Sequence, residues 1–294
     1  MEWVFLSARY KVPARTNRHD FSAVAFLPVP LNARDVGECI YCGTQEEPLN
    51  REHAVPFGLN GPWTLLRASC VGCASTTHRF ERDTLRSLWP GIRNVLAMQS
   101  RRRRERDKTL PLVIQRAGVQ EVVQIPPSEF PLYLPTPMFP PPGVVAGRKP
   151  MRGIFSKLDL IRVAGPTFEE VSGRYPGAEF VGARANFSPE EFARMLAKIA
   201  LCGAVYALGV APFGQTPIRR VILGKDPNIG GWVGSWEGDP VNEAKGLHAM
   251  QVRASGSDIH VILRLFAQFG APEYHVALGA ADPKFVASSE WPWK

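Results

Sequence analysis

Four of the five cysteines in this chain form two Cys-x-x-Cys pairs with 27 residues between them. Thiolates are ligands that zinc prefers, and four of them fill a tetrahedral shell and leave no position for water. Such a closed site ties chain segments together and cannot activate a substrate, so we expect a structural zinc ion. The predicted ligands are Cys39, Cys42, Cys70 and Cys73.

Other uses of the cysteines fit less well. Either pair alone could be a redox dithiol, but two clustered copies have a simpler joint explanation as one metal site. The first residues show no secretory signal and no apolar run could span a bilayer, which favours metal over disulfides and predicts a cytoplasmic protein without a membrane partner. Cys202, in an apolar helical stretch, is expected to be a core residue.

An acid–histidine pair lies between the two knuckles, in the sequence Arg51-Glu52-His53-Ala54-Val55-Pro56. A neutral imidazole, with an ordinary pKa of about 6.5, can take a proton from water near neutral pH. A divalent ion beside it could polarise a phosphate and stabilise the leaving oxygen. The plainer alternatives are a buried, hydrogen-bonded His53, and a Glu52 that forms a salt bridge with Arg51 or Arg79.

The stretch from Glu38 to Glu81 resembles the HNH endonuclease family, whose pattern joins a knuckle, an acid-His-x-x-Pro strand, a glycine-containing turn and a second knuckle that opens a helix. The resemblance implies a ββα-metal fold that binds one catalytic Mg²⁺ or other divalent ion, separate from the zinc. It also implies that His53 is the general base and that Glu52 and His78 hold the catalytic ion. Glu81 is a further candidate ligand or a partner for Arg79.

The chain departs from the family pattern at two places. Ala74 follows Cys73, where Asn or His is common, and the asparagine usually found a few residues before the second knuckle is absent, since residues 64–69 read Thr-Leu-Leu-Arg-Ala-Ser. Asn60, in the turn, could replace that asparagine. His78 could equally be a helix-surface residue with no special role.

Positive charge is concentrated next to the second knuckle. Ten basic and four acidic residues lie between Arg79 and Lys108, which accounts for +6 of the net charge of +8. This distribution is typical of a protein that contacts a polyanion, although a solvated basic linker would look the same. The expected partner is nucleic acid, with DNA as the first choice because the motif resembles that of an endonuclease family. The predicted contacts are Arg79, Arg82, Arg101, Arg102, Arg103 and Arg104.

The elements that position these residues can be read from spacing. Residues 73–88 lack Gly and Pro and place Phe80, Thr84 and Leu88 on one edge, which predicts a helix that ends at Pro90-Gly91. Ser188 is typical of a helix cap, with Pro189 in the first turn and an apolar face beyond it. That face consists of Phe192, Met195, Leu196, Ile199 and Tyr206.

Strands are expected at 110–114 and 119–125. Three further strands, at 248–254, 259–266 and 273–278, are expected to pair in order as two consecutive antiparallel hairpins. Two more strand-like pieces lie near Trp3 and Ser22, and the proline-rich segment 126–150 reads as an extended connection. The fold class is therefore α+β: a lead-in (1–36), an HNH-like zinc module (37–100), a basic linker (101–109) and a mixed α+β domain with antiparallel hairpins (110–294).

Three functions remain open at this point. The first is a metal-dependent HNH-type endonuclease that hydrolyses DNA, with a homodimer as one way to supply the two sites that double-strand cutting needs. The second is a catalytically inactive, zinc-stabilised nucleic-acid-binding protein. In the third, the C-terminal domain senses an unknown ligand or partner, and tryptophans line a pocket or, more simply, anchor the core; they are Trp232, Trp236, Trp291 and Trp293.

Overall fold

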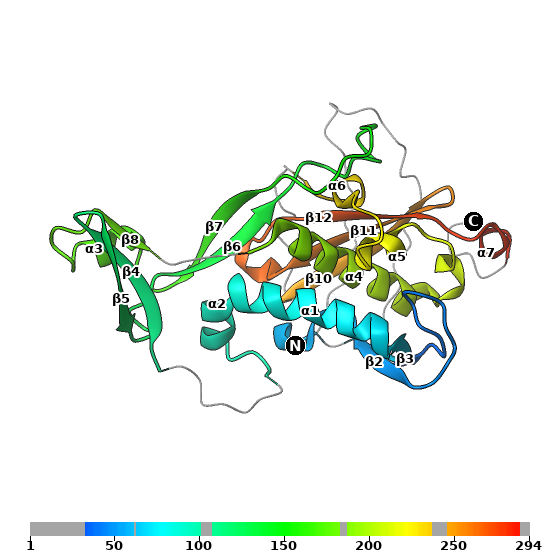
Figure 1. Cartoon of the computed structure of the whole chain (residues 1–294), viewed down its shortest axis with the longest axis horizontal. Helices are drawn as coiled ribbons and strands as arrows, with labels where there is room; N and C mark the ends of the chain where they lie inside the picture. Colours follow the sequence, from blue (N-terminus) through cyan, green and yellow to red (C-terminus); the bar gives the residue numbers. More distant parts are fainter. Residues whose placement is uncertain (1–32, 62, 101–107, 183–186, 237–245, 289–294) are drawn as a thin grey trace.

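The computed structural model describes residues 33–61, 63–100, 108–182, 187–236 and 246–288 as a mixed α and β structure with antiparallel sheets (Figure 1). The strand-like pieces expected near Trp3 and Ser22 and the arginine run 101–104 lie outside this part of the chain. None of the helices in these ranges is long and apolar enough to cross a bilayer.

The cysteine-containing segment folds into a small sheet followed directly by a helix. Strand β3 lies in the middle, with β1 parallel and β2 antiparallel to it, and α1 continues from its last residue. The bounds are Arg34–Asp35 for β1, Leu49–His53 for β2, Thr64–Cys70 for β3 and Val71–Ser87 for α1. The predicted helix is confirmed, and it begins two residues earlier than expected.

Pro90 was expected only to end the first helix, but it is also the first residue of the next one. Helix α2 covers Pro90–Val95, with the proline in its first turn, where the missing N–H costs nothing. Trp89, between the two helices, is buried, and its ring meets those of Phe192 and Phe266 edge-on, with centroid distances of 5.6 Å and 5.0 Å. Residues from both predicted halves of the chain thus share one hydrophobic core.

A second sheet forms the projecting lobe at one end of the molecule (Figure 1). Its strand order is β5-β4-β8, and the two strands expected at 110–114 and 119–125 are confirmed. The bounds are Leu110–Arg116 for β4, Val119–Ile125 for β5, Phe168–Ser172 for α3 and Phe180–Gly182 for β8.

The expectation of an extended connection over 126–150 is wrong in part, because strand β6 (Leu132–Met138) lies inside it and pairs with β7 (Lys157–Ala164). β6 tolerates two prolines because their backbone groups lie along the edge that does not face β7. On that edge the carbonyl of Pro135 accepts from Trp89 Nε1 at 2.9 Å, and that of Pro137 from the Tyr274 hydroxyl at 3.0 Å.

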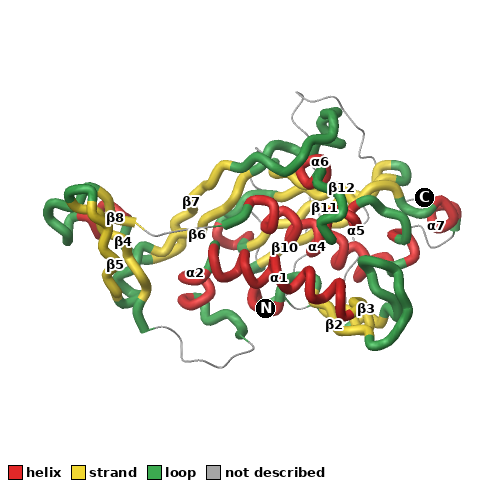
Figure 2. The backbone as a smooth tube through the Cα atoms, in the orientation of Figure 1, coloured by secondary structure: helices red, strands yellow, loops and turns green. Residues whose placement is uncertain are grey.

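Helix α4 (Pro189–Leu208) is the centre of the molecule. The Ser188 hydroxyl caps it by accepting from the Glu191 N–H at 3.3 Å, as predicted. The helix is buried on more sides than its apolar face indicated, because α1 packs on it from one side and the four-stranded sheet from the other (Figure 2).

That sheet has the order β10-β11-β12-β9 and contains both predicted hairpins. Its strands are β9 (Val233–Ser235), β10 (His248–Ser255), β11 (Asp258–Leu265) and β12 (Tyr274–Ala280). Short helices around it are α5 (Ile218–Ile222), α6 (Ile229–Trp232) and α7 (Pro283–Ala287), with 3₁₀ turns at Ala211–Phe213 and Ala267–Phe269.

Candidate functional site

The four paired cysteines come together in space. Their sulfur atoms all lie within 4.8 Å of one another, and the Sγ atoms of Cys42 and Cys70 are 3.8 Å apart. Sulfurs at the corners of a tetrahedron around zinc, with Zn–S bonds of about 2.3 Å, are separated by about 3.8 Å. The cluster could therefore hold a metal ion such as zinc, as the spacing predicted.

Local backbone geometry brings each pair of sulfurs together. The first pair lies in a tight turn, closed by hydrogen bonds of 2.8 Å from Gly43 N to Cys39 O and from Cys39 N to Thr44 O. Gly43 has a φ of +78°, which an L side chain rarely adopts. In the second pair, Cys70 ends β3 and Cys73 lies in the first turn of α1.

The thiols of the cluster differ in acidity. A hydrogen bond from Cys73 to the sulfur of Cys39 lowers the pKa of Cys39 to about 4, so the thiolate, which is the form that binds zinc, is favoured at this one position at neutral pH. The same hydrogen bond raises the pKa of Cys73, and burial raises that of Cys42.

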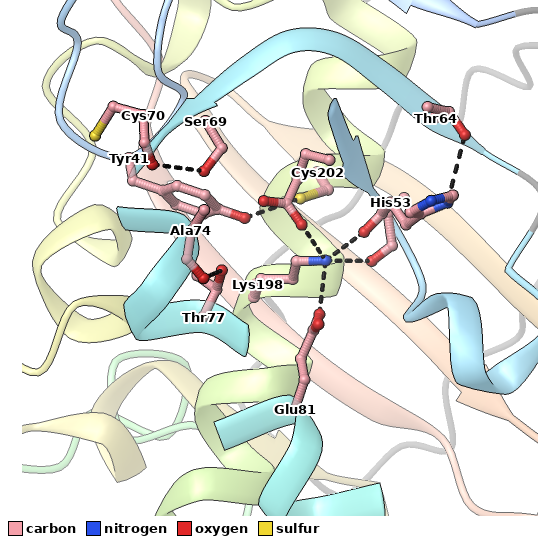
Figure 3. Close-up of polar contacts among 12 residues, drawn as sticks. Tyr41, His53, Thr64, Ser69, Cys70, Ala74, Thr77, Glu81, Lys198 and Cys202 are labelled. Carbon is pink, nitrogen blue, oxygen red and sulfur yellow. Dashed lines mark hydrogen bonds and ion pairs between the residues drawn. The ribbon is translucent and has the colours of Figure 1, made fainter. Parts of the chain in front are cut away.

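Beside the cysteines, a lysine from α4 lies at the centre of a buried charge cluster (Figure 3). The Nζ atom of Lys198 is 2.8 Å from Glu52 Oε1 and 2.8 Å from Glu81 Oε1. It also donates to the backbone carbonyls of His53 and, at 3.4 Å, Ala54. The sequence analysis considered Arg51 and Arg79 as partners for Glu52, but the partner is Lys198.

The cluster is charged despite its burial. The side chain of Lys198 is fully buried, and desolvation alone would lower its pKa, but Glu52 and Glu81 outweigh this effect and raise the pKa well above its ordinary value. Desolvation also raises the pKa of Glu81, against the attraction of the Lys198 ammonium. The lysine is thus held as a cation. One signal in the sequence could have revealed this buried charge. Lys198 is the single charged residue in the otherwise apolar run Met195-Leu-Ala-Lys-Ile-Ala-Leu-Cys202.

His53 is at the end of β2, but its ring does not join Glu52. Successive side chains of a strand point to opposite faces. The Glu52 carboxylate is buried and pairs with Lys198. The half-buried His53 ring lies beside Thr64, with 3.4 Å between Nδ1 and the hydroxyl oxygen (Figure 3). The ring also lies against Phe57, at a centroid distance of 5.6 Å.

A catalytic divalent ion does not fit these residues as they are placed. The Glu52 carboxylate is bound to the Lys198 ammonium, and His78 is exposed on α1. Within the described ranges, the four cysteines are the one group of at least three metal-binding side chains whose ligand atoms lie together. The structure therefore does not bring Glu52, His53 and His78 into a shared metal site.

The outer face of α1 is basic. Arg79, Arg82 and Arg86 are exposed. Arg82 forms a salt bridge with Asp83, with 2.8 Å between Nε and Oδ1. Arg93, counted in the same basic window, has a different role, because its Nε donates to the carbonyl of Gly58 at 3.0 Å and its side chain is partly buried. Residues Arg101 to Arg104 lie outside the described part of the chain.

Other singled-out residues have structural contacts. Asn60 has a left-handed backbone, and its side-chain oxygen accepts from the N–H of Gln99 at 2.8 Å. Trp232 lines a pocket of about 280 Å³ next to β12, and Trp236 stacks on His275 at 5.6 Å. Trp291 and Trp293 are not among the described residues.

Comparison with known proteins finds no match: no family model, no curated protein and no solved structure is significantly similar to this chain. The likeness to the HNH family consequently rests on the motif residues alone.

Proposed function

We propose that this protein binds DNA through a zinc-stabilised module and that the exposed basic face of α1 contacts the phosphate backbone. The observation that carries the proposal is the placement of Arg79, Arg82 and Arg86 on the outer side of a helix whose inner side is buried. Arginine is well suited to this role because its planar guanidinium can form two hydrogen bonds to one phosphate.

The geometry of α1 supports contact with a duplex backbone. Positions 79, 82 and 86 are three and four residues apart and so share one face, and they extend over roughly 10 Å at 1.5 Å per residue. The helix is anchored by Cys73 in its first turn, which belongs to the cysteine cluster, and by Phe80 and Leu85, which are buried along it. Such contacts supply affinity without sequence preference.

Binding is preferred over cutting because the one carboxylate next to His53 is already occupied. Glu52 is paired with Lys198 in the interior, and the alternation of β2 places the His53 ring on the opposite face. The exposed arginines of α1 thus offer a phosphate-binding face, whereas Glu52, His53 and His78 do not form a shared metal site in the described part of the chain.

The test is the salt dependence of binding to a short DNA duplex, measured by fluorescence anisotropy with the zinc-loaded chain. Each phosphate contact contributes about −0.9 to the slope of log K against log [salt], so changing Arg79, Arg82 and Arg86 to Gln should make the slope shallower by up to about 2.7. The matched control changes three exposed arginines elsewhere, Arg116, Arg152 and Arg174, to Gln. Equal slopes for the parent and the α1 variant would contradict the proposal.

The second candidate is DNA hydrolysis by an HNH-type site with His53 as the general base, as the family resemblance implies. The observation that favours it is the order β2-β3-α1, in which His53 is the last residue of β2 and the second cysteine pair lies at the start of the helix.

A plasmid-cleavage assay separates the two candidates. The zinc-loaded chain is tested with Mg²⁺, Mn²⁺ and Ni²⁺ added singly, beside His53→Ala. Cleavage by the parent that is lost in His53→Ala, with zinc content and DNA affinity unchanged, would establish the hydrolase. DNA binding without cleavage under any of these conditions would reject the hydrolase and support the binding function.

A further inference from the structure

Four oxygen atoms converge on the ammonium group of Lys198. Two belong to the carboxylates of Glu52 and Glu81, each 2.8 Å from Nζ, and two are the backbone carbonyls of His53 and Ala54. They come from the end of β2, the residue after it, and α1, whereas the lysine comes from α4, at least 144 residues further along the chain than His53 and Ala54. Three separate elements therefore meet at one buried positive charge (Figure 3).

We propose that Lys198 is the resident cation of this site, where its ammonium group takes the place of a divalent metal ion. This inference goes beyond DNA binding, and it is independent of that function because it concerns the interior of the module.

The oxygen set is one that a hard divalent ion would accept. Carboxylates and backbone carbonyls are the ligands that bind Mg²⁺, Mn²⁺ and Ca²⁺ in proteins. An ammonium group offers three N–H donors to the same kind of acceptor. The lysine thereby satisfies, from within the chain, a cage of oxygens that would otherwise recruit an ion from solution.

Lysine and ion exclude each other at this position. Divalent ions lie about 2.0 to 2.6 Å from their oxygen ligands. An ion bound to the inner oxygens of Glu52 and Glu81 would therefore lie within a few ångströms of Nζ, and two cations at that distance repel strongly away from water.

The site also requires a cation. The carboxylates of Glu52 and Glu81 are nearly inaccessible, and the second oxygen of Glu52 is buried without a hydrogen-bond partner among the described residues. Removal of the ammonium would leave two carboxylates buried next to each other, which is strongly unfavourable unless a proton or another cation replaces it.

The experiment measures Mn²⁺ binding by electron paramagnetic resonance and thermal unfolding of the zinc-loaded full chain. The parent should bind no Mn²⁺ at Glu52. Lys198→Ala should unfold at a lower temperature and should acquire a Mn²⁺ site, with saturating Mn²⁺ raising its Tm by about 5 °C or more. The gain should disappear when Glu52→Gln is added to Lys198→Ala.

Arg194→Ala is the matched control. It removes a partly buried cation from the same helix, one turn earlier, where the partner is Glu190 and not the module. This variant should acquire no Mn²⁺ site. Failure of folded Lys198→Ala to bind Mn²⁺ would overturn the proposal.

A measurement on the parent chain keeps the proposal falsifiable if Lys198→Ala does not fold. Bound Mn²⁺ broadens the NMR signals of nearby nuclei, so the amide signal of Ala54 should stay sharp in the parent when Mn²⁺ is added. Selective broadening of that signal would show that an ion enters beside Lys198 and would overturn the proposal.

Discussion

The imidazole of His248, on β10, donates from Nε2 to the backbone carbonyl of Leu59, in the turn that follows β2, at 2.8 Å. Its other nitrogen, Nδ1, accepts from the N–H of Phe266 at 3.3 Å. One neutral tautomer satisfies both contacts. The histidine is buried, and desolvation lowers its pKa to about 4, so it joins the module to the sheet in its neutral form.

Stability should therefore fall as the solution is acidified. Between an unfolded pKa of 6.5 and a folded pKa of about 4, the unfolded chain binds more protons at His248, so unfolding becomes easier as pH falls through this window. The expected loss is about 3 kcal/mol by pH 4. Urea unfolding at pH 7, 6, 5 and 4 measures this loss. His248→Gln should be less stable at pH 7 and should show a smaller pH dependence; an unchanged slope would rule out His248 as the cause.

Removal of zinc should destabilise the whole molecule and not only the cysteine segment. α1 starts at the cysteine cluster and packs against α4, and one core connects both parts. Treatment with a strong chelator, or Cys73→Ser, should lower the Tm in a single transition that includes the near-ultraviolet signal of Trp89. The control is Cys202→Ala, which should retain one zinc per chain. A separate early transition that leaves the rest intact would show that the segment is thermodynamically independent.

Local spacing explains why the sequence predicted some features and not others. Cys39, Cys42, Cys70 and Cys73 were found because each pair is set by a turn of four residues, and the capped helix at Ser188 because its signals are adjacent in sequence. Lys198 was missed because its partner Glu52 is 146 residues away, a separation over which no pattern in the sequence acts.

Strand β6 was missed for a different reason. Pro135 and Pro137 normally argue against a strand, and only the three-dimensional structure shows that their backbone groups face Trp89 and Tyr274 instead of β7. Glu52 and His53 are neighbours in sequence, yet the alternation of the strand separates their side chains. For that reason the motif alone could not show whether they act together.

Cys202 should be chemically silent in the folded protein. It is fully buried on α4, and desolvation raises its pKa to about 12, so the reactive thiolate is scarce at pH 8. Iodoacetamide should leave Cys202 unmodified in the native chain and should alkylate it in urea, as read by mass spectrometry of the peptides. Cys42, which is exposed, should react quickly once zinc is removed and serves as the positive control. Alkylation of both cysteines at similar rates in the chelated but folded chain would contradict the burial of Cys202.

Gly61 should be indispensable to the β2–β3 connection. A Cβ at this position would overlap the backbone carbonyl group of Val55 and would lie 2.8 Å from the Cβ atom of Val55. Val55 belongs to the short connection between the paired strands β2 and β3, so its backbone cannot move aside cheaply. Gly61→Ala should therefore destabilise the protein by about 1–3 kcal/mol, as for other overpacked sites. Gly214→Ala is the control, since a Cβ there meets nothing within 4 Å and its φ of −52° suits any residue. Urea unfolding should show a loss for the first variant and none for the second, because only the first forces the connection that follows His53 to shift.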